Sequence, residues 1–365
     1  MSGIDAARNL GLKVVRRLQS AHKPVVRMLR RGERQREHQA FREEVAAIER
    51  DIAALVRGRE PILAGPWLAE VGYEVLYWIP FLRWLVDAHG VPRERLIVVS
   101  RGGMEALYAD LAGTYVDIFD LMTPAALADR NARRQAEHEG GGQKQSAGSP
   151  LDDDLVAAAC ARLGLDAARV CHPSLLFRMF RHVWHGNLPS DVLWTHTRYR
   201  TDRLPPAVLT DLPADFIAVK IYAGPALSTR EETRAAVRAM VARAATIAPV
   251  LLLETALGLD EHRDFDLGGL DNVTSVGAWM EPRTNLALQL SIIARSRFFL
   301  GTCGGLAWVA PFLGTPTVAV YDGDHLLLPH LMLARQAGRA AGAAEFAPLD
   351  LRATGRLGLL GEPFR

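Results

Sequence analysis

Short apolar runs alternate along the chain with longer segments of helical periodicity. Residues 61–64, 95–100 and 114–119 have the length and the β-branched content of strands. Amphipathic segments over residues 74–89 and 104–111 separate these runs and predict helices. Because strands that alternate with helices form parallel sheets, this part of the chain is expected to be wound as half of a Rossmann fold.

The same alternation returns in the C-terminal half of the chain. Strands are predicted at residues 216–222, 250–253, 273–276, 298–300 and 317–321, and helices at 229–248, 285–296 and 306–313. Residues 204–213 hold three prolines and predict a linker. We therefore expect an α/β protein with two Rossmann-like parallel-sheet domains, over residues 61–203 and 214–365, that face each other across a cleft.

Residues 129–154 interrupt the pattern of the first domain. They are polar, contain three consecutive glycines and show no apolar period, a composition typical of a segment without a packed core. We expect a mobile loop here, followed by helices at residues 155–163 and 174–184.

The first 60 residues form a basic extension. They hold 14 Lys and Arg against 8 Asp and Glu, so that the rest of the chain is net acidic although the whole carries +2. An apolar stripe with spacings of three and four then predicts a helix, formed by Phe41, Val45, Ile48, Ile52 and Leu55. Two heptads are fewer than the three or four that a coiled coil needs, so we expect this helix to pack on the body of the protein.

Residues 8–36 carry ten of these basic residues and one acid. An attraction of about 1 kcal/mol per basic residue near an anionic surface would suffice for peripheral binding to the inner face of a membrane. The alternative is a solvated basic tail, and the sequence leaves both open.

Composition excludes several classes of protein. Cys160, Cys171 and Cys303 lie at no metal-ligand or redox spacing, which indicates reduced thiols and a cytoplasmic protein. No apolar run approaches the roughly 18 residues of a transmembrane helix, and the N-terminus lacks the apolar core of a signal peptide. Basic residues are not interleaved with aromatics on a predicted face, so we expect no nucleic-acid partner.

A small-residue turn follows the strand predicted at residues 298–300. It consists of Gly301, Thr302, Cys303, Gly304 and Gly305, and a helix follows it. Such a turn directs backbone N–H groups out of a helix N-terminus, which suits a phosphate or pyrophosphate. The alternative is a turn whose glycines only allow close packing of helix on sheet.

The run F-F-L-G-T-x-G-G-x-A-x-x-A-P-F-L-G-T-P, which begins at residue 298, resembles the donor-site motif of GT-B glycosyltransferases. It is most similar to the heptosyltransferase-like and fucosyltransferase-like groups that build bacterial surface polysaccharides. Heptosyltransferases have Asp-Ser/Thr-Gly-x-x-His at the turn and Leu-Gly-x-Pro at its close. Gly305 matches the glycine and residues 313–316 the close, whereas Cys303 replaces the Asp and Trp308 the His. The resemblance implies a GT-B fold whose C-terminal domain binds a nucleotide sugar.

The same resemblance suggests a catalytic base. The heptosyltransferase loop Gly-Asp-x-x-x-x-Leu-Pro-x-Leu matches residues 73–82, with Glu74 at the catalytic Asp. An inverting transfer needs a carboxylate that takes the proton of the acceptor hydroxyl. Glu70 lies four residues earlier and is the rival. Alternatively, both acids only favour the start of the helix that Glu74 begins.

Cations and acids near the turn are candidates for donor binding. A helix N-terminus contributes about 0.3–1 kcal/mol, whereas micromolar affinity corresponds to about 8 kcal/mol, so cations must help to bind a diphosphate. Lys220 and Arg230 are the first candidates and Arg283 the third. Glu254 and Glu261 are candidates for the ribose hydroxyls, as the resemblance implies.

Aromatic and histidine residues of the first domain are candidates for the acceptor site. They are Trp67, Tyr73, His182 and His185. His182 and His185 have the spacing of a metal pair, but the sequence offers no third ligand nearby, and GT-B transfer needs no metal. We expect no cofactor beyond the donor.

The sequence thus predicts an inverting, metal-independent glycosyltransferase that acts on a glycan or a lipid-linked acceptor in cell-surface polysaccharide synthesis. The alternative is a GT-B-like subunit that binds a nucleotide or glycan without turnover in a membrane-associated assembly complex. A nucleotide-dependent oxidoreductase is a third class, but no complete G-x-G-x-x-G follows the first strand.

Overall fold

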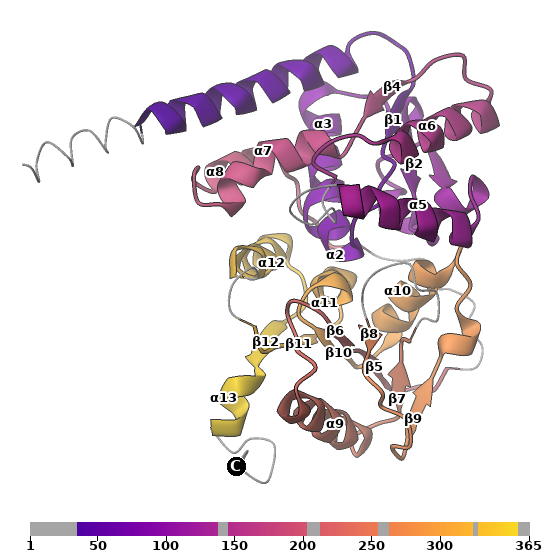
Figure 1. Cartoon of the computed structure of the whole chain (residues 1–365), viewed down its shortest axis with the longest axis vertical. Helices are drawn as coiled ribbons and strands as arrows, with labels where there is room; N and C mark the ends of the chain where they lie inside the picture. The colour runs from indigo at the N-terminus through magenta and orange to yellow at the C-terminus, as the bar shows by residue number, and fades with distance from the viewer. Residues whose placement is uncertain (1–34, 138–144, 203–211, 255–262, 324–327, 357–365) are drawn as a thin grey trace, which may run out of the picture.

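Two parallel sheets organise the chain, one in each half. The computed structural model describes residues 35–137, 145–202, 212–254, 263–323 and 328–356. We call the described residues up to 202 the N-terminal half and those from 212 the C-terminal half. The two halves lie one above the other in Figure 1.

The N-terminal sheet has the order β3-β2-β1-β4. Its strands are β1 (Ile62–Ala64), β2 (Leu96–Ser100), β3 (Thr114–Asp117) and β4 (Arg169–Cys171), all paired in parallel. Alternate strand residues are buried on opposite faces: Leu63 and Val99 pack with α5 and α6, whereas Ile62 and Val98 belong to the cluster that includes α3 and α7. The helices are α3 (Ile79–His89), α4 (Glu105–Tyr108), α5 (Pro124–Glu137), α6 (Pro150–Leu163), α7 (Ser174–Trp184) and α8 (Asp191–Thr195).

The C-terminal sheet has the order β12-β11-β10-β5-β7-β9. Its strands are β5 (Ile217–Lys220), β7 (Val250–Leu252), β9 (Val273–Ser275), β10 (Phe298–Thr302), β11 (Thr317–Tyr321) and β12 (Phe346–Asp350). Numbered along the chain, these six strands lie as 6-5-4-1-2-3, which is the Rossmann order read from the opposite edge. The N-terminal order is the first part of the same arrangement. The expected α/β fold with two Rossmann-like halves is therefore confirmed.

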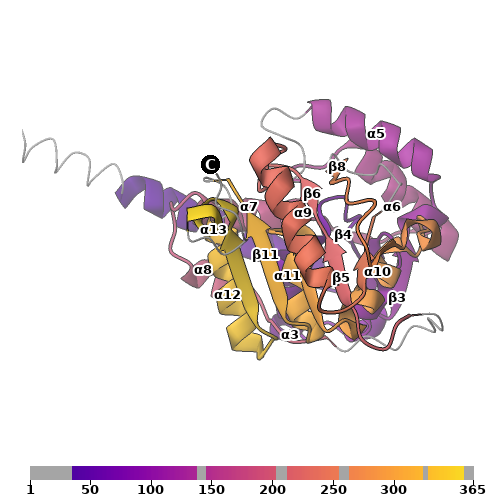
Figure 2. The same ribbon diagram turned by 90° about the horizontal axis from the view of Figure 1, so that it is seen from below.

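Helices cover both faces of the C-terminal sheet (Figure 2). They are α9 (Glu231–Ala245), α10 (Asn285–Arg295), α11 (Gly305–Val309), α12 (Leu328–Ala341) and α13 (Leu351–Arg356). Val237 of α9 packs on one face with Val219, whereas Ile292 of α10 belongs to the cluster that buries Phe299. That second cluster continues into the N-terminal half, where it includes Trp78, so the two halves share one apolar core.

The helix over residues 35–56 packs on the N-terminal half, as its apolar stripe predicts. Ile48 and Ile52 are fully buried. Glu44 binds Arg181 and His182, with a shortest distance of 2.7 Å. Residues 1–34, which include most of the basic segment, lie outside the described residues. In the part of the chain that is described, no helix has the length and apolarity needed to cross a membrane.

The prediction of a mobile loop at residues 129–154 is wrong at both of its ends. Helix α5 continues to Glu137, and α6 begins at Pro150 behind a capping box formed by Ser149 and Asp152. Gln145 is buried and its side-chain amide donates to Asp152 and to the carbonyl of Pro66. Buried polar residues here form hydrogen bonds with one another, so this segment is packed without an apolar stripe in its sequence. Residues 138–144 and the predicted linker up to residue 211 lie outside the described residues.

Candidate functional site

The C-terminal sheet has its topological switch between β5 and β10. Ligands of Rossmann-type sheets bind at the carboxyl ends of the strands at such a switch. Lys220, the last residue of β5, is paired in register with Gly301 of β10. The chain then turns through Gly304 and Gly305, whose φ angles of 128° and 43° favour glycine, and α11 begins. The predicted turn therefore lies at the switch.

The glycine turn touches the N-terminal half directly. Gly72 belongs to α2 (Val71–Tyr73), and a Cβ added to it would lie 2.7 Å from the backbone nitrogen of Gly305. Only a glycine allows this approach. The two segments that the sequence singled out for catalysis and donor binding are thus in contact, although they come from different halves.

Thr302 and Tyr222 fix the geometry of the turn. The Thr302 hydroxyl accepts from the backbone nitrogen of Tyr222 at 2.9 Å and donates to its carbonyl oxygen at 2.8 Å. Tyr222 lies in β6 (Tyr222–Ala223), and its hydroxyl would be 2.8 Å from a Cβ at Gly305. Thr302 therefore acts on the backbone, and the Tyr222 ring lies beside the turn.

Cys303 and Trp308 are both buried. Burial raises the pKa of the Cys303 thiol to about 12, so it stays protonated at neutral pH. The Trp308 ring meets Tyr73 edge-on, with ring centroids 5.8 Å apart. These two positions, at which the sequence departs from the heptosyltransferase pattern, thus contribute apolar packing and no charge.

Lys220 is paired with an acid. Its Nζ lies 2.7 Å from Asp264 Oδ1, and the lysine side chain is 12% exposed. Asp264 belongs to β8 (Arg263–Asp264), which pairs antiparallel with β6. Glu254 follows β7 and is partly exposed, whereas Glu261 lies outside the described residues.

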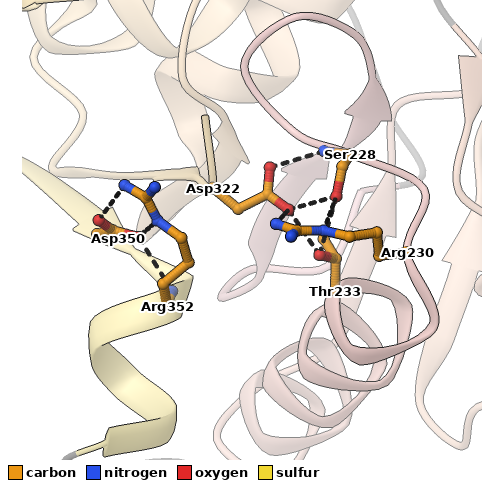
Figure 3. A network of polar contacts seen from close by, with 6 residues as sticks. All are labelled: Ser228, Arg230, Thr233, Asp322, Asp350 and Arg352. Atoms are coloured by element: carbon orange, nitrogen blue, oxygen red, sulfur yellow. Dashed lines mark hydrogen bonds and ion pairs between the residues drawn. The ribbon is translucent and has the colours of Figure 1, made fainter. Parts of the chain in front are cut away.

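Arg230 borders a second polar network at the carboxyl ends of the strands (Figure 3). Asp322, directly after β11, accepts from Ser228 Oγ at 2.5 Å, Thr233 Oγ1 at 2.6 Å and Arg230 at 3.2 Å. Burial acts to raise the pKa of Asp322, but its hydrogen bonds outweigh burial and the pKa is lowered. The Arg230 side chain is 59% exposed, while that of Asp322 is 3% exposed. The network thus anchors the segment before α9 and leaves more than half of the Arg230 side-chain surface in solvent. Figure 3 also shows Asp350 and Arg352, which pair with each other at the end of β12.

Glu74 is 1% exposed and directly follows α2, whose Gly72 contacts the glycine turn. Its Oε1 accepts hydrogen bonds from Ser100 Oγ and Tyr108 Oη, both at 2.5 Å. Burial raises the pKa of the Glu74 carboxyl to about 7, and the two hydrogen bonds act against this rise. Residues 74–78 form one π-helical turn, a feature frequent at functional sites.

Glu70 precedes α2 and is partly exposed. Burial, and then the charge of Glu70, raise the pKa of the Tyr73 hydroxyl, which places this carboxylate near Tyr73. Its side chain makes no capping hydrogen bond to α2. Glu74 lies in the first turn of the π-helical segment, and its carboxylate is bound to Ser100 and Tyr108.

Arg283 joins the halves at a second point. Its Nε and an Nη lie 2.5 and 2.9 Å from the carboxylate of Asp120, which follows β3. The backbone nitrogen of Ala287 donates to the carbonyl of Gly102 nearby. The carboxyl ends of both sheets therefore meet at this interface, and Arg283 is bound to an acid of the other half.

The four candidate acceptor residues lie in different environments. Trp67 is fully buried and stacks on Trp78. His182 is buried against Glu44 at 2.8 Å and contacts the helix over residues 35–56. His185 is exposed at the end of α7, and Tyr73 lies at the interface. The structure brings only Tyr73 to the glycine turn.

Several residues at the interface and the strand ends were missed by the sequence analysis. Asp264, Asp322 and His330 bind their partners across long sequence separations. Asp322 could have been identified as a polar residue that directly follows a buried strand. Among the described residues, no group of three His, Cys, Asp or Glu could hold a metal ion.

Comparison with known proteins gives distant structural matches. No family model and no curated protein matches the chain. The E. coli heptosyltransferase WaaC with ADP is similar at 16% identity and a TM-score of 0.39, over 82% of this chain and 98% of that one. A glycosyl transferase family 9 protein from Veillonella parvula is similar at 11% identity and a TM-score of 0.40, over 85% of this chain and 91% of that one. A putative UDP-N-acetylglucosamine 2-epimerase from Listeria monocytogenes is similar at 11% identity and a TM-score of 0.32, over 84% of this chain and 99% of that one. With TM-scores below 0.5, these likenesses carry no weight for function, and the fold rests on the strand orders above.

Proposed function

We propose that the protein is a glycosyltransferase that takes a sugar from a nucleotide-sugar donor and transfers it, with inversion and without a metal, to a glycan or lipid-linked acceptor of a cell-surface polysaccharide. The observation that carries the proposal is the contact of Gly72 with Gly305. It brings a segment with two acids against a glycine turn at the switch of a Rossmann sheet, which is where a nucleotide is expected.

The donor diphosphate would bind at the turn over residues 301–305. Lys220 lies opposite Gly301, and Arg230 is the more exposed cation. Both cations are paired with acids. A diphosphate would therefore replace Asp264 as the partner of Lys220 and Asp322 as the partner of Arg230. Glu254 and Glu261 remain our candidates for the ribose hydroxyls.

Glu70 is the base that the geometry favours. A general base must reach the acceptor hydroxyl before its pKa matters, and Glu70 is partly exposed, whereas Glu74 is 1% exposed. Glu74 has the better pKa, about 7, and is the second candidate. Tyr73 and the exposed His185 remain the candidates for acceptor contact; buried Trp67 and His182 would act only by supporting the site.

A binding subunit without turnover is the second candidate function. Two observations favour it: the burial of Glu74 and the uncharged pair at Cys303 and Trp308. Such a subunit would bind nucleotide or glycan and leave the donor intact.

We also propose that residues 8–36 bind an anionic membrane face. The full chain is then expected to sediment with vesicles that contain about a quarter of anionic phospholipid and to stay in solution with neutral vesicles. Equal sedimentation with both, or with neither, would contradict this part of the proposal.

A thermal-shift screen against nucleoside diphosphates and nucleotide sugars tests the donor site. A ligand that binds only the folded protein adds about 2.7 kcal/mol of stability at 100 times its Kd. Stabilisation by one nucleotide family, lost in Lys220→Met and kept in Arg283→Ala, supports the site, because Lys220 is in register with Gly301 of the turn whereas Arg283 binds Asp120 after the edge strand β3 of the other sheet. The absence of a shift with every nucleotide would refute donor binding.

A further inference from the structure

His330 of α12 is buried at the interface between two tyrosines of the other half. Its Nδ1 lies 2.5 Å from Tyr77 Oη, and its Nε2 lies 3.0 Å from Tyr73 Oη. Trp184 of α7 and Trp308 of α11 flank the imidazole, with ring centroids at 5.7 and 5.8 Å. Both ring nitrogens are therefore used across the interface.

The two hydrogen bonds between His330 and the tyrosines run in opposite directions. A neutral imidazole has one N–H donor and one acceptor nitrogen, so one tyrosine donates to His330 and the other accepts from it. Tyr77 is fully buried and His330 is nearly so. Removing the imidazole would leave two hydroxyls without this partner in an apolar site, which costs more than the net value of the bonds themselves.

The two tyrosines lie on either side of Glu74 in the sequence, and Tyr73 follows Gly72, which touches the glycine turn. We propose that His330 is a positioning residue that, through Tyr73 and Tyr77, holds the segment over residues 70–77 closed against the glycine turn. We call these three residues the His330 clasp. Its effect on transfer rests on the proposed function, whereas the contact itself does not.

Hydrogen exchange tests the clasp without reference to activity. Amides 71–79 of His330→Phe are expected to exchange about tenfold faster than in the wild type, since two hydrogen bonds of the segment are lost. Met332→Ala, at an exposed residue of the same helix, is the control and should leave the exchange unchanged. Equal exchange in His330→Phe and the wild type would overturn the proposal.

Tyr73→Phe keeps the experiment decisive if His330→Phe folds poorly. This variant removes one hydroxyl, keeps the ring, and is expected to speed exchange of amides 71–79 about threefold. His330→Gln, which keeps a polar side chain at the buried position, is the second background. Tyr73→Phe should have a smaller effect there than in the wild type, because the imidazole that binds the hydroxyl is absent. Equal effects of Tyr73→Phe in both backgrounds would contradict a shared contact.

Kinetics then separate positioning from donor binding. In His330→Phe, kcat for transfer is expected to fall at least about tenfold, because the reacting groups are misplaced, while the Kd for the nucleoside diphosphate stays within about twofold. Loss of nucleotide affinity with an unchanged kcat would refute the positioning role. If the wild type transfers no sugar, the proposed function fails, and hydrogen exchange still decides whether the clasp exists.

Discussion

Replacing Gly72 with alanine should force the two halves apart. The new Cβ would lie 2.7 Å from the nitrogen of Gly305 and 2.9 Å from its Cα and carbonyl oxygen. All three are backbone atoms, so no side-chain rotation relieves the overlap. Because Gly72 lies in a short helix, a methyl group is otherwise compatible with its backbone.

The expected cost follows from the size of this overlap. Ordinary contact begins at 3.4 Å, so the backbones must separate by about 0.7 Å to relieve the 2.7 Å contact, and overpacking of this kind costs about 1–3 kcal/mol. Urea unfolding of Gly72→Ala should show this loss of unfolding free energy. Transfer should fall as well, because Glu70 and the glycine turn move apart.

Gly148→Ala is the matched control, since a Cβ at Gly148 meets nothing within 4 Å. Its free energy of unfolding should equal that of the wild type or be slightly higher, because alanine restricts the unfolded chain more than glycine does. Wild-type stability together with wild-type nucleotide affinity in Gly72→Ala would refute the direct contact between the halves.

Three further predictions test neighbouring groups. The folded pKa of Glu74, about 7, exceeds its ordinary value of 4.5, so its stabilising contribution is full below pH 4.5 and is lost as the pH rises through 7. Urea unfolding from pH 4.5 to 8 should therefore show the wild type losing about 3 kcal/mol relative to Glu74→Gln, and parallel pH profiles would contradict the raised pKa. Asp322→Ala should lower the free energy of unfolding by about 2–4 kcal/mol, because buried donors lose a charged acceptor, whereas Asp350→Ala should cost under about 1 kcal/mol; equal losses would argue against the network. Arg283→Ala should change stability by about 0–1 kcal/mol, and less at high salt, so a larger loss that is insensitive to salt would show that the pair with Asp120 is not an exposed ion pair.

Central strands were predictable because parallel strands buried on both faces need continuous apolar residues. Residues 298–302 and 317–321 have that pattern and form β10 and β11. Strands β4 and β12 were not predicted, because Arg169 and Pro348 interrupt the apolar run that identifies a strand; the edge positions of these two strands accommodate both residues. Helices α7, α9 and α10 were likewise predictable from their apolar period, whereas α5 and α12 were not predicted.

The candidate site could be predicted only in part. The glycines of the turn are recognisable because the local backbone conformation favours glycine, whereas the acids of the first loop were identified through the resemblance to heptosyltransferases. The partners of polar side chains could not be predicted, because they lie far apart in the sequence, as Lys220 and Asp264 do and as His330 and Tyr73 do. Nor could the pattern show that Glu74 points into the core, because a helix position next to a turn is compatible with either environment.

Release of nucleoside diphosphate from a panel of nucleotide sugars, with acceptor glycans present, tests the central claim most directly. We predict release by the wild type from one donor class and a loss of at least about 100-fold in Glu70→Gln, within the range of general-base catalysis, with binding of that donor retained. If the wild type binds the donor but releases no diphosphate with any acceptor, the protein is a binding subunit. Full activity in both Glu70→Gln and Glu74→Gln would contradict the proposed mechanism.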